Sequence, residues 1–356
     1  MSKLLKLRNK MKEIGVDAVI VLDELNQHYL SEFAFTDGFL LITHAKAYLV
    51  TDFRYYEMAL NSANKNFEVL TPDDRGAFID KALAEENCKT VGFEGGSVSY
   101  DVYRRYCEKH PHLKFENIGD AIEVIRQIKD ADEIEKMQKA QDITDKAFSH
   151  ILKVINRDMT ELDVAVELEY AMRKNGASAF AFDTISVSGD ASALPHGTPR
   201  NVKLRDGFLT MDFGAKFDGY CSDMTRTIVI GKPDEDIKKL YNTVLKAQLS
   251  ALEYLKAGAD CGEADKIARD IIDAVPEYKG AFGHSLGHSV GLFIHESPRL
   301  YSRGFGRKLK VGEILTVEPG IYLFGKYGCR IEDMVAITEN GIHNFTHSTK
   351  ELIVIE

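Results

Sequence analysis

The chain has 356 residues, of which 44% are hydrophobic and 28% charged, a composition that argues against disorder, a fibrous repeat or a membrane-embedded fold. At about 150 residues per domain, this length predicts two domains. The formal net charge is −10 and the basic residues are scattered along the chain, so we expect no nucleic-acid partner.

Hydropathy, the N-terminal segment and the cysteines indicate where the protein is expected to be located. No stretch offers the roughly 18 consecutive apolar residues of a spanning helix, so we expect no membrane partner. The N-terminus is basic as far as Lys12, and Asp17 interrupts the apolar run that follows, which does not fit a secretory signal. The five cysteines never form a CxxC arrangement. We therefore expect a cytoplasmic protein with buried free thiols and no thiolate zinc site.

The first part of the chain alternates strand-like runs with stretches of helical composition. We expect strands near 16–22, 38–43, 47–52, 67–72 and 90–95, and helices over 54–63 and 100–110. Near Asp130 the pattern changes to apolar residues spaced three and four apart, which predicts a long amphipathic helix. Asp130 and Glu133 form a candidate capping box at its start. These features predict an α/β N-terminal domain over residues 1–125.

The second domain, residues 126–356, contains an element order that runs twice. Two helices and three strands are expected near 131–156, 161–174, 183–188, 207–214 and 220–230. Two more helices and three more strands are expected near 234–256, 263–274, 282–294, 314–323 and 329–338. This order predicts an α+β domain with a pseudo-symmetric sheet, helices on one face, and a site at the seam between its halves.

Two aspartates lie on either side of a hairpin signal. The dipeptide Asp218-Gly219 between β-type residues is typical of a two-residue turn. A hairpin about this turn places Asp212 opposite Thr225, and it projects Asp212 and Asp223 from one face with backbones about 7–8 Å apart. Carboxylates at this separation repel each other unless a cation lies between them. The pattern therefore indicates one metal ion or a pair of them.

A second hairpin, centred near Gly325, would place Glu318 opposite Glu332 with both carboxylates on one face. Between the two acidic pairs, HSLGHSVGLFIHE supplies three histidines, His284, His288 and His295. The last follows the second by an odd offset of seven residues, so a bend or bulge near Gly291 must return it to the same face. Each residue alone has a plain structural explanation, but buried strands rarely hold several unpartnered carboxylates.

These motifs together resemble one known family. The eleven-residue spacing of the two aspartates, the GHxxGxxxHE run over 287–296, VEPGIY over 317–322 and RIED over 330–333 are similar to those of the Xaa-Pro aminopeptidase and prolidase family of metallopeptidases. The segments AFDTISVSGDASALPHGTP and GYCSDMTRT also resemble it. The N-terminal domain resembles the creatinase-type domain that accompanies this family. The resemblance covers nearly the full chain and implies a pita-bread fold for the C-terminal domain.

The resemblance implies that two divalent ions are held by five ligands, Asp212, Asp223, His288, Glu318 and Glu332. Asp223 and Glu332 would bridge the ions, and Glu318 would also accept a proton from the bridging water. Four carboxylates and one imidazole suit Mn²⁺, with Co²⁺, Fe²⁺ or Zn²⁺ as alternatives. Two such ions roughly 3.5 Å apart can activate a shared water and stabilise charge on an attacked carbonyl.

Further roles follow from the resemblance for three histidines, His196, His284 and His295. The first and the last would contact the scissile carbonyl or the leaving nitrogen, and the second would line the proline-side pocket. Tyr322 and Arg330 match positions that orient ligands and relay protons, and a purely structural role for both stays open. Arg299 stands where a prolidase-like arginine would hold a substrate carboxylate. The alternative for it is an ordinary surface or ion-paired arginine.

The expected activity is that of an Xaa-Pro aminopeptidase, a dinuclear-metal peptidase that removes an N-terminal residue when proline follows it. An Xaa-Pro dipeptidase (prolidase) is the alternative, and the sequence does not decide between them. Methionine aminopeptidase shares the ligands but would not normally carry such an N-terminal domain, and creatinase-like or non-catalytic relatives usually lack most ligands. The expected partners are peptides with proline at the second position, and we expect a homodimer because it is the commonest oligomer.

Overall fold

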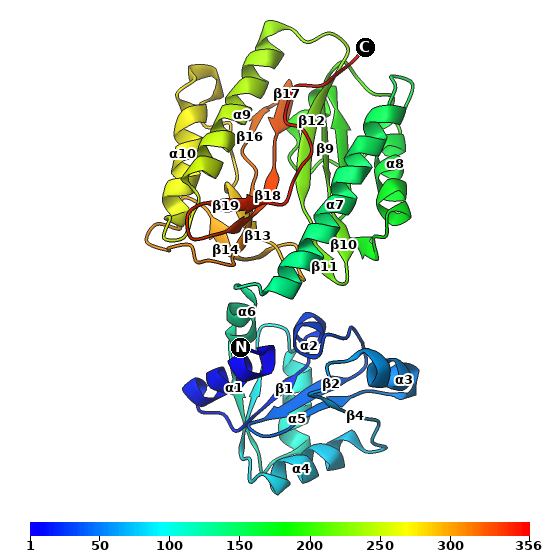
Figure 1. Cartoon of the computed structure of the whole chain (residues 1–356), viewed down its shortest axis with the longest axis vertical. Coiled ribbons are helices and arrows are strands. Elements are labelled where there is room, and N and C mark those ends of the chain that lie inside the picture. The colour runs from blue at the N-terminus through cyan, green and yellow to red at the C-terminus, as the bar shows by residue number, and fades with distance from the viewer. The chain divides into compact units, whose positions relative to one another are not determined.

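In the computed structural model, which describes residues 1–356, the chain divides into an N-terminal unit (Met1–Arg126) and a C-terminal unit (Gln127–Glu356) (Figure 1). The strands of the N-terminal unit are β1 (Ala18–Val21), β2 (Phe39–Thr43), β3 (Ala47–Val50), β4 (Glu68–Leu70), β5 (Thr90–Phe93) and β6 (Lys114–Asn117). They form one sheet with the spatial order β4-β3-β2-β1-β5-β6. Only β2 runs antiparallel to its neighbours.

Helices pack on this sheet and bury its central strands. The helices are α1 (Lys3–Ile14), α2 (Glu24–Ser31), α3 (Phe53–Ser62), α4 (Arg75–Glu85), α5 (Tyr100–Lys109) and α6 (Ala121–Arg126). Every residue of β1, β2 and β3 is buried, and Ile79 and Leu83 of α4 pack in one core with Ile20 and Leu41. Burial of both sheet faces explains why these strands are unbroken apolar runs in the sequence.

The C-terminal unit combines two larger and two smaller sheets with two helix pairs. Its helices are α7 (Ala131–Val154), α8 (Glu161–Lys174), α9 (Glu235–Tyr254) and α10 (Cys261–Asp273), with short 3₁₀ turns η1 (Gly189–Ala193) and η2 (Pro276–Tyr278). α7 packs against α8, and α9 packs against α10. The predicted capping box is present at the start of α7, where Asp130 and Glu133 bond to each other's backbone N–H groups.

The strands of this unit follow the doubled order that the sequence predicts, in more and shorter pieces. They are β7 (Ala179–Phe180), β8 (Ile185–Ser188), β9 (Gly207–Phe213), β10 (Ala215–Phe217), β11 (Tyr220–Cys221), β12 (Met224–Ile230), β13 (Gly287–Ser289), β14 (Glu296–Leu300), β15 (Ile314–Val317), β16 (Gly320–Leu323), β17 (Tyr327–Arg330), β18 (Asp333–Ile337), β19 (Ile342–Asn344) and β20 (Val354–Ile355). The larger sheets have the orders β20-β12-β9-β8 and β14-β13-β15-β18-β19. The smaller sheets are β11-β10-β7 and β16-β17.

The first predicted hairpin is confirmed in its register. Phe217 pairs with Tyr220 across the turn, and Asp212 pairs with Thr225 farther along. The turn residues Asp218 and Gly219 have φ values of 49° and 81°, the left-handed pair that a type I′ turn requires. The sheet changes from β9–β12 to β10–β11 close to Asp223, which lies in the break between β11 and β12.

The segment expected as one strand over 282–294 is different in the structure. Only β13 is a strand, and residues 290–295 bend back so that β14 pairs with it antiparallel, with His288 opposite Arg299. A Cβ at Gly287 would lie 2.0 Å from the Thr316 backbone oxygen, and one at Gly291 would lie 2.5 Å from Glu296 Oε2. The glycines therefore permit close approaches that end the strand early, and the bend expected near Gly291 is present.

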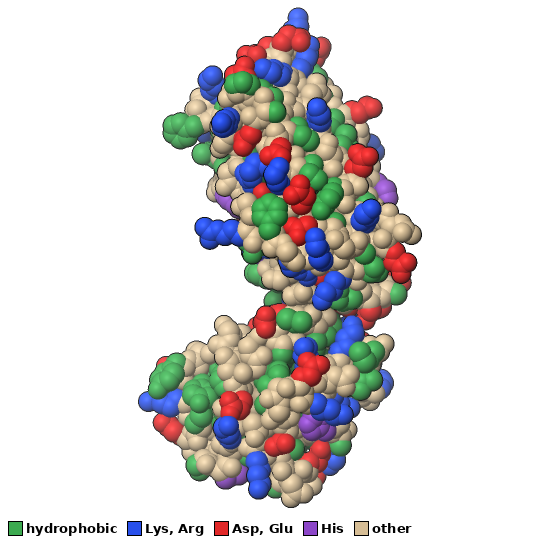
Figure 2. Space-filling model, turned by 90° about the vertical axis from the view of Figure 1, so that its left-hand side faces the viewer, with side chains coloured by type: hydrophobic (Ala, Val, Ile, Leu, Met, Phe, Trp, Pro, Cys, Tyr) green, Lys and Arg blue, Asp and Glu red, His purple; other side chains and the backbone are tan.

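The surface carries charged side chains of both signs (Figure 2), and the chain contains five free cysteines. On the face shown in Figure 2, basic and acidic side chains are intermingled over both units. No helix is long and apolar enough to cross a membrane. All five cysteines are free, and burial is complete for three of them but only partial for Cys88 and Cys107.

Candidate active site

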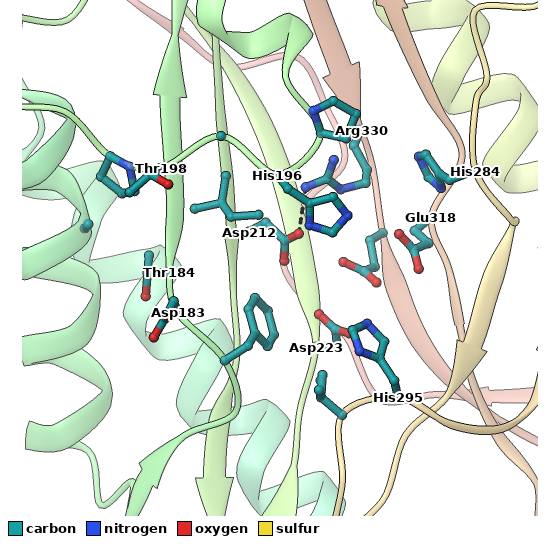
Figure 3. A pocket seen from close by; sticks show the side chains of 18 of the residues that line it. Asp183, Thr184, His196, Thr198, Asp212, Asp223, His284, His295, Glu318 and Arg330 are labelled. Atoms are coloured by element: carbon teal, nitrogen blue, oxygen red, sulfur yellow. Dashed lines mark hydrogen bonds and ion pairs between the residues drawn. The ribbon is translucent and has the colours of Figure 1, made fainter.

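A cavity of about 680 Å³ lies in the C-terminal unit between its two larger sheets. Its lining includes all five residues proposed as metal ligands, Asp212, Asp223, His288, Glu318 and Glu332. Figure 3 shows side chains from both halves of this unit converging on one centre. The lining also includes five other residues singled out in the sequence, His196, His284, His295, Arg299 and Arg330. Tyr322 does not line the cavity and lies behind Arg330.

Three side chains form the tightest cluster. One ligand atom from each of Asp223, His288 and Glu332 lies within 4.8 Å of the others. His288 Nε2 is 3.6 Å from Asp223 Oδ2 and 3.4 Å from Glu318 Oε1. Asp223 and Glu332 are only 4% and 2% exposed, so water does not screen their charges well.

Burial and mutual repulsion make the charged forms of the four neighbouring carboxylates unfavourable. Burial, then the neighbouring acids, holds the pKa values of Asp223 and Glu332 well above their ordinary range. Burial likewise raises the pKa of Glu318 to about 8, although the Arg330 guanidinium opposes the rise. A bound cation would remove this penalty, because it favours the charged form of every acid around it.

Asp212 provides an independent test of whether a cation fits. Its Oδ2 accepts a hydrogen bond of 2.6 Å from Arg330 Nη2, but its Oδ1 is buried and accepts no hydrogen bond. An unpartnered carboxylate oxygen is costly in the interior. Because this oxygen belongs to a set of hard oxygen donors with one imidazole, the residues fit a divalent metal.

The imidazole of His288 is prepared as a neutral ligand. Its Nδ1 lies 3.2 Å from the Ser289 carbonyl oxygen, which accepts the ring proton and leaves the Nε2 lone pair facing the acids. Burial, followed by the charge on His295, lowers the pKa of His288 to about 3. The ring therefore carries no charge at neutral pH, as metal ligation requires.

Two threonines that the sequence analysis missed orient the glutamates. Thr225 Oγ1 donates to Glu332 Oε2 at 2.7 Å, and Thr316 Oγ1 donates to Glu318 Oε1 at 3.1 Å. Thr225 follows Asp223 by two residues, and Thr316 precedes Glu318 by two. This two-residue spacing is the strand period that puts side chains on one face, so the signal was present in the sequence.

Arg330, Tyr322 and His284 form a connected chain of hydrogen bonds. Arg330 donates to Asp212 through Nη2, at 2.6 Å, and to the Tyr322 hydroxyl through Nη1, at 2.7 Å. The Tyr322 hydroxyl lies 2.9 Å from His284 Nε2, while His284 Nδ1 faces the Ser285 carbonyl oxygen at 2.9 Å. Because the carbonyl accepts from Nδ1, Tyr322 donates to Nε2. Burial, then Arg330, lowers the pKa of His284 to about 4, so this ring is neutral.

A half-buried arginine outside the predicted set holds the backbone around His284. Arg269 on α10 donates to the carbonyl oxygens of Phe282 and His284 at 2.6 and 2.9 Å. Its partner Asp265 is fully buried and accepts from the Leu286 backbone N–H at 3.0 Å. The Asp265–Arg269 pair therefore fixes the loop between α10 and β13. Its only sequence signal is an acid four residues before an arginine on a helix.

Three groups face the open part of the cavity. The ring of His295 lies 4.5 Å from that of His288, with the two planes at 73°. His196 and His295 are exposed within the cavity wall, and Figure 3 shows both side chains directed toward the carboxylates. Arg299 is also exposed and lines the cavity, but it makes no ion pair or hydrogen bond within the chain. Of the two alternatives for this residue, the structure shows no ion pair, and a substrate-binding role stays a prediction.

Comparison with known proteins gives the same architecture. Residues 135–339 match the metallopeptidase family M24, and residues 3–128 match the creatinase/prolidase N-terminal domain. The chain is 39% identical to the Xaa-Pro dipeptidase of Pyrococcus furiosus over 353 residues, which is 99% of both chains.

Two solved structures extend the likeness to three dimensions. The Xaa-Pro dipeptidase from Bacillus anthracis is 40% identical with a TM-score of 0.94 over 99% of each chain. The X-Pro aminopeptidase from Thermotoga maritima is 36% identical with a TM-score of 0.90 over 100% of each chain. The chain therefore belongs to metallopeptidase family M24, and it consists of a creatinase/prolidase-type N-terminal domain and a pita-bread C-terminal domain.

Proposed function

We propose that the protein is an Xaa-Pro dipeptidase that hydrolyses the bond between one amino acid and a C-terminal proline. The observation that carries the proposal is Arg299, whose unpaired guanidinium lines the cavity. On the adjacent strand, His288 is its cross-strand neighbour. A dipeptide presents its carboxylate one residue from the scissile bond, and a guanidinium binds such a group in bidentate fashion. The relatives named as Xaa-Pro dipeptidases favour this activity over the aminopeptidase expected first.

The proposed metal ligands are the four acids and the one histidine described above, which would hold two divalent ions. Mn²⁺ is our first choice because hard carboxylate oxygens dominate the donor set, and Co²⁺, Fe²⁺ and Zn²⁺ are alternatives. When bound, two divalent ions supply a water nucleophile at neutral pH and positive charge for the oxygen of the attacked carbonyl.

The remaining chemistry falls to side chains of the chain itself. Glu318 would take the proton from the attacking water, because a bound cation keeps this carboxylate in the charged form that can accept one. The exposed imidazoles of His196 and His295 stand where they can hydrogen-bond the substrate carbonyl and deliver a proton to the leaving nitrogen. Arg330 and Tyr322 keep Asp212 and His284 in position.

Proline specificity follows from what the bond lacks. An Xaa-Pro amide is tertiary and has no N–H to donate. A wall formed by His284 and His295 can receive the ring, whereas a secondary amide would place an unpaired donor there. The carboxylate of the same proline would then bind Arg299. One residue of the substrate would therefore provide both the ring and the charge that the site recognises.

The proposal is tested by three substrates assayed with Mn²⁺, Ala-Pro, Ala-Pro-Ala and Ala-Ala. We expect kcat/KM to be highest for Ala-Pro and cleavage of Ala-Ala to be slow. Faster cleavage of Ala-Pro-Ala would assign the protein to the Xaa-Pro aminopeptidases, the second candidate, which the Thermotoga maritima structure supports. Equal cleavage of Ala-Ala would remove proline specificity.

Location and assembly are further parts of the proposal. A reducing cytoplasmic environment agrees with five unpaired cysteines. A homodimer is the commonest symmetric assembly, and light scattering at several protein concentrations measures it directly.

A further inference from the structure

A second cavity, of about 510 Å³, lies wholly within the N-terminal unit. Its lining comes from helices α4 and α5, which contact each other, from α2, and from residues that follow β1 and precede β2. None of the residues assigned to the peptidase site lines it. Crevices beside the carboxyl ends of strands, where the sheet order changes direction, are common ligand sites in open α/β sheets.

One buried side-chain oxygen among the lining residues of this cavity has no hydrogen-bond partner. Gln27 is 1% exposed, and its Nε2 donates to the carbonyl oxygens of Val21 and Gly38 at 3.1 and 3.2 Å. Its Oε1 is buried and accepts no hydrogen bond. Because Nε2 is committed to two carbonyls, Oε1 is an acceptor with no donor inside the protein. A ligand with an N–H or O–H group would satisfy it.

Charged groups of both signs line the same cavity. Arg75 of α4 and Arg105 of α5 make no ion pair or hydrogen bond within the chain. Lys109 adds a third positive charge and is held by Asp74 at 3.3 Å. Glu24, also in the lining, has no partner either. The lining therefore offers two unpaired guanidiniums, on α4 and α5, and one unpaired carboxylate, on α2.

Most of the remaining lining is apolar; the exceptions are Asp37, which pairs with Arg54, and His110, which pairs with Asp80. Leu22, Phe39, Ile79 and Val102 contribute side chains, and Tyr106 adds an aromatic ring. Guanidinium groups hold carboxylates in bidentate fashion, and an apolar wall accepts an aliphatic side chain.

We propose that this cavity binds a small zwitterion, a free α-amino acid or dipeptide with an aliphatic side chain. Its carboxylate would lie against Arg75 and Arg105, and its ammonium group would donate to Gln27 Oε1 on the side of Glu24. The proposal is independent of the peptidase activity, because it rests only on residues of the N-terminal unit. It adds a binding site to a domain to which the proposed reaction assigns no chemistry.

The test uses the full-length, metal-free, isotope-labelled protein, in which a dipeptide stays intact. Gly38 and Gly76 line the cavity, so their amide signals report binding there. We expect saturable shifts of both signals with L-leucine, L-proline and Ala-Pro, and weak or no shifts with acetate or inorganic phosphate. Absence of shifts with all three zwitterions would overturn the proposal, as would phosphate binding with equal affinity.

Matched variants locate the site. Arg75→Ser with Arg105→Ser should weaken binding at least about tenfold, the factor expected from losing charge-assisted hydrogen bonds. Arg104→Ser changes a neighbouring exposed arginine that does not line the cavity and should leave binding unchanged. Arg299→Leu, in the peptidase cavity, should also leave the two glycine shifts unchanged. Full binding by the double variant would contradict the proposal.

Discussion

Glu318 and Glu332 face each other at a point where the chain passes from one sheet to another. On one side Val317 pairs with Asp333 in β15–β18, and on the other Gly320 pairs with Arg330 in β16–β17. Both ladders have the same register. Glu318 and Glu332 therefore lie opposite each other between the two ladders, without a backbone pair in either one. The same arrangement recurs at Asp223 in the other half. Three of the five proposed metal ligands therefore lie where strands change sheets, whereas Asp212 and His288 lie within β9 and β13.

The first prediction concerns the proposed metal ligand Asp223. Asp223→Ala should lose bound metal and reduce kcat/KM by more than about a hundredfold, because even outer-shell changes at metal sites cost 10–100-fold. The N-terminal unit should remain folded, since it has its own core. Metal analysis and dipeptide kinetics measure both effects. Asp206→Asn, an exposed aspartate before β9, is the matched control. Wild-type metal content in Asp223→Ala would show that the ligand set is wrong.

The second prediction separates two neighbouring histidines. His295→Ala should keep its metal and lower kcat by about 10²–10⁴-fold, the usual contribution of a positioned proton donor. His288→Ala should lose metal affinity, because its neutral Nε2 faces Asp223 and Glu318. Titration with Mn²⁺ distinguishes the two variants. The assignment is reversed if His295→Ala loses metal while His288→Ala retains it.

The third prediction concerns pH and metal binding. Burial raises the pKa of Glu318 to about 8, and burial with like charge holds the pKa values of Asp223 and Glu332 well above their ordinary range. The metal-free cluster therefore holds protons at neutral pH, and a cation must displace them. His288 releases none, because burial lowers its pKa to about 3.

Mn²⁺ affinity should accordingly rise as the pH increases from about 6 to about 8, with proton release on binding. Calorimetry in buffers of different ionisation enthalpy measures the released protons. An affinity that stays constant over this range would mean that the acids are already charged in the metal-free protein.

The fourth prediction concerns the Asp265–Arg269 pair. Arg269→Met leaves the buried carboxylate of Asp265 unpaired and should destabilise the C-terminal unit by about 3 kcal/mol. Activity should fall as well, because the loop carrying His284 loses two anchors. Adding Asp265→Asn should restore part of the stability. Lys266→Met, on an exposed face of the same helix, should change the melting temperature little. Equal melting of Arg269→Met and Lys266→Met would contradict this role.

Local sequence rules were sufficient for the two hairpins. An Asp-Gly turn fixes the register of β9 and β12, and strand period two then places Asp212 opposite Thr225. The second register follows in the same way from the turn at Gly325, which has a φ of 70°. These contacts depend on neighbours along the chain, so a pattern in the sequence can specify them.

Other features depend on contacts that no local pattern contains. The strand expected over 282–294 ends at Ser289 because the chain turns back to β14, and Gly291 packs closely against the Glu296 carboxylate. Arg269 binds carbonyl oxygens 13 and 15 residues away in the sequence. Helices α2 and α4 were missed although Asp23 and Asp74 cap them, because each has a weak apolar stripe.

The most direct test of the proposed dipeptidase compares Ala-Pro with its C-terminal amide, Ala-Pro-NH₂, in the wild type, Arg299→Leu and the exposed control Arg303→Leu. The amide keeps the tertiary bond and the proline ring but removes the charge that Arg299 is proposed to bind. We expect the wild type and the control to favour Ala-Pro, and we expect Arg299→Leu to lose that preference mainly through a higher KM for Ala-Pro. Retention of the full preference by Arg299→Leu would contradict the account.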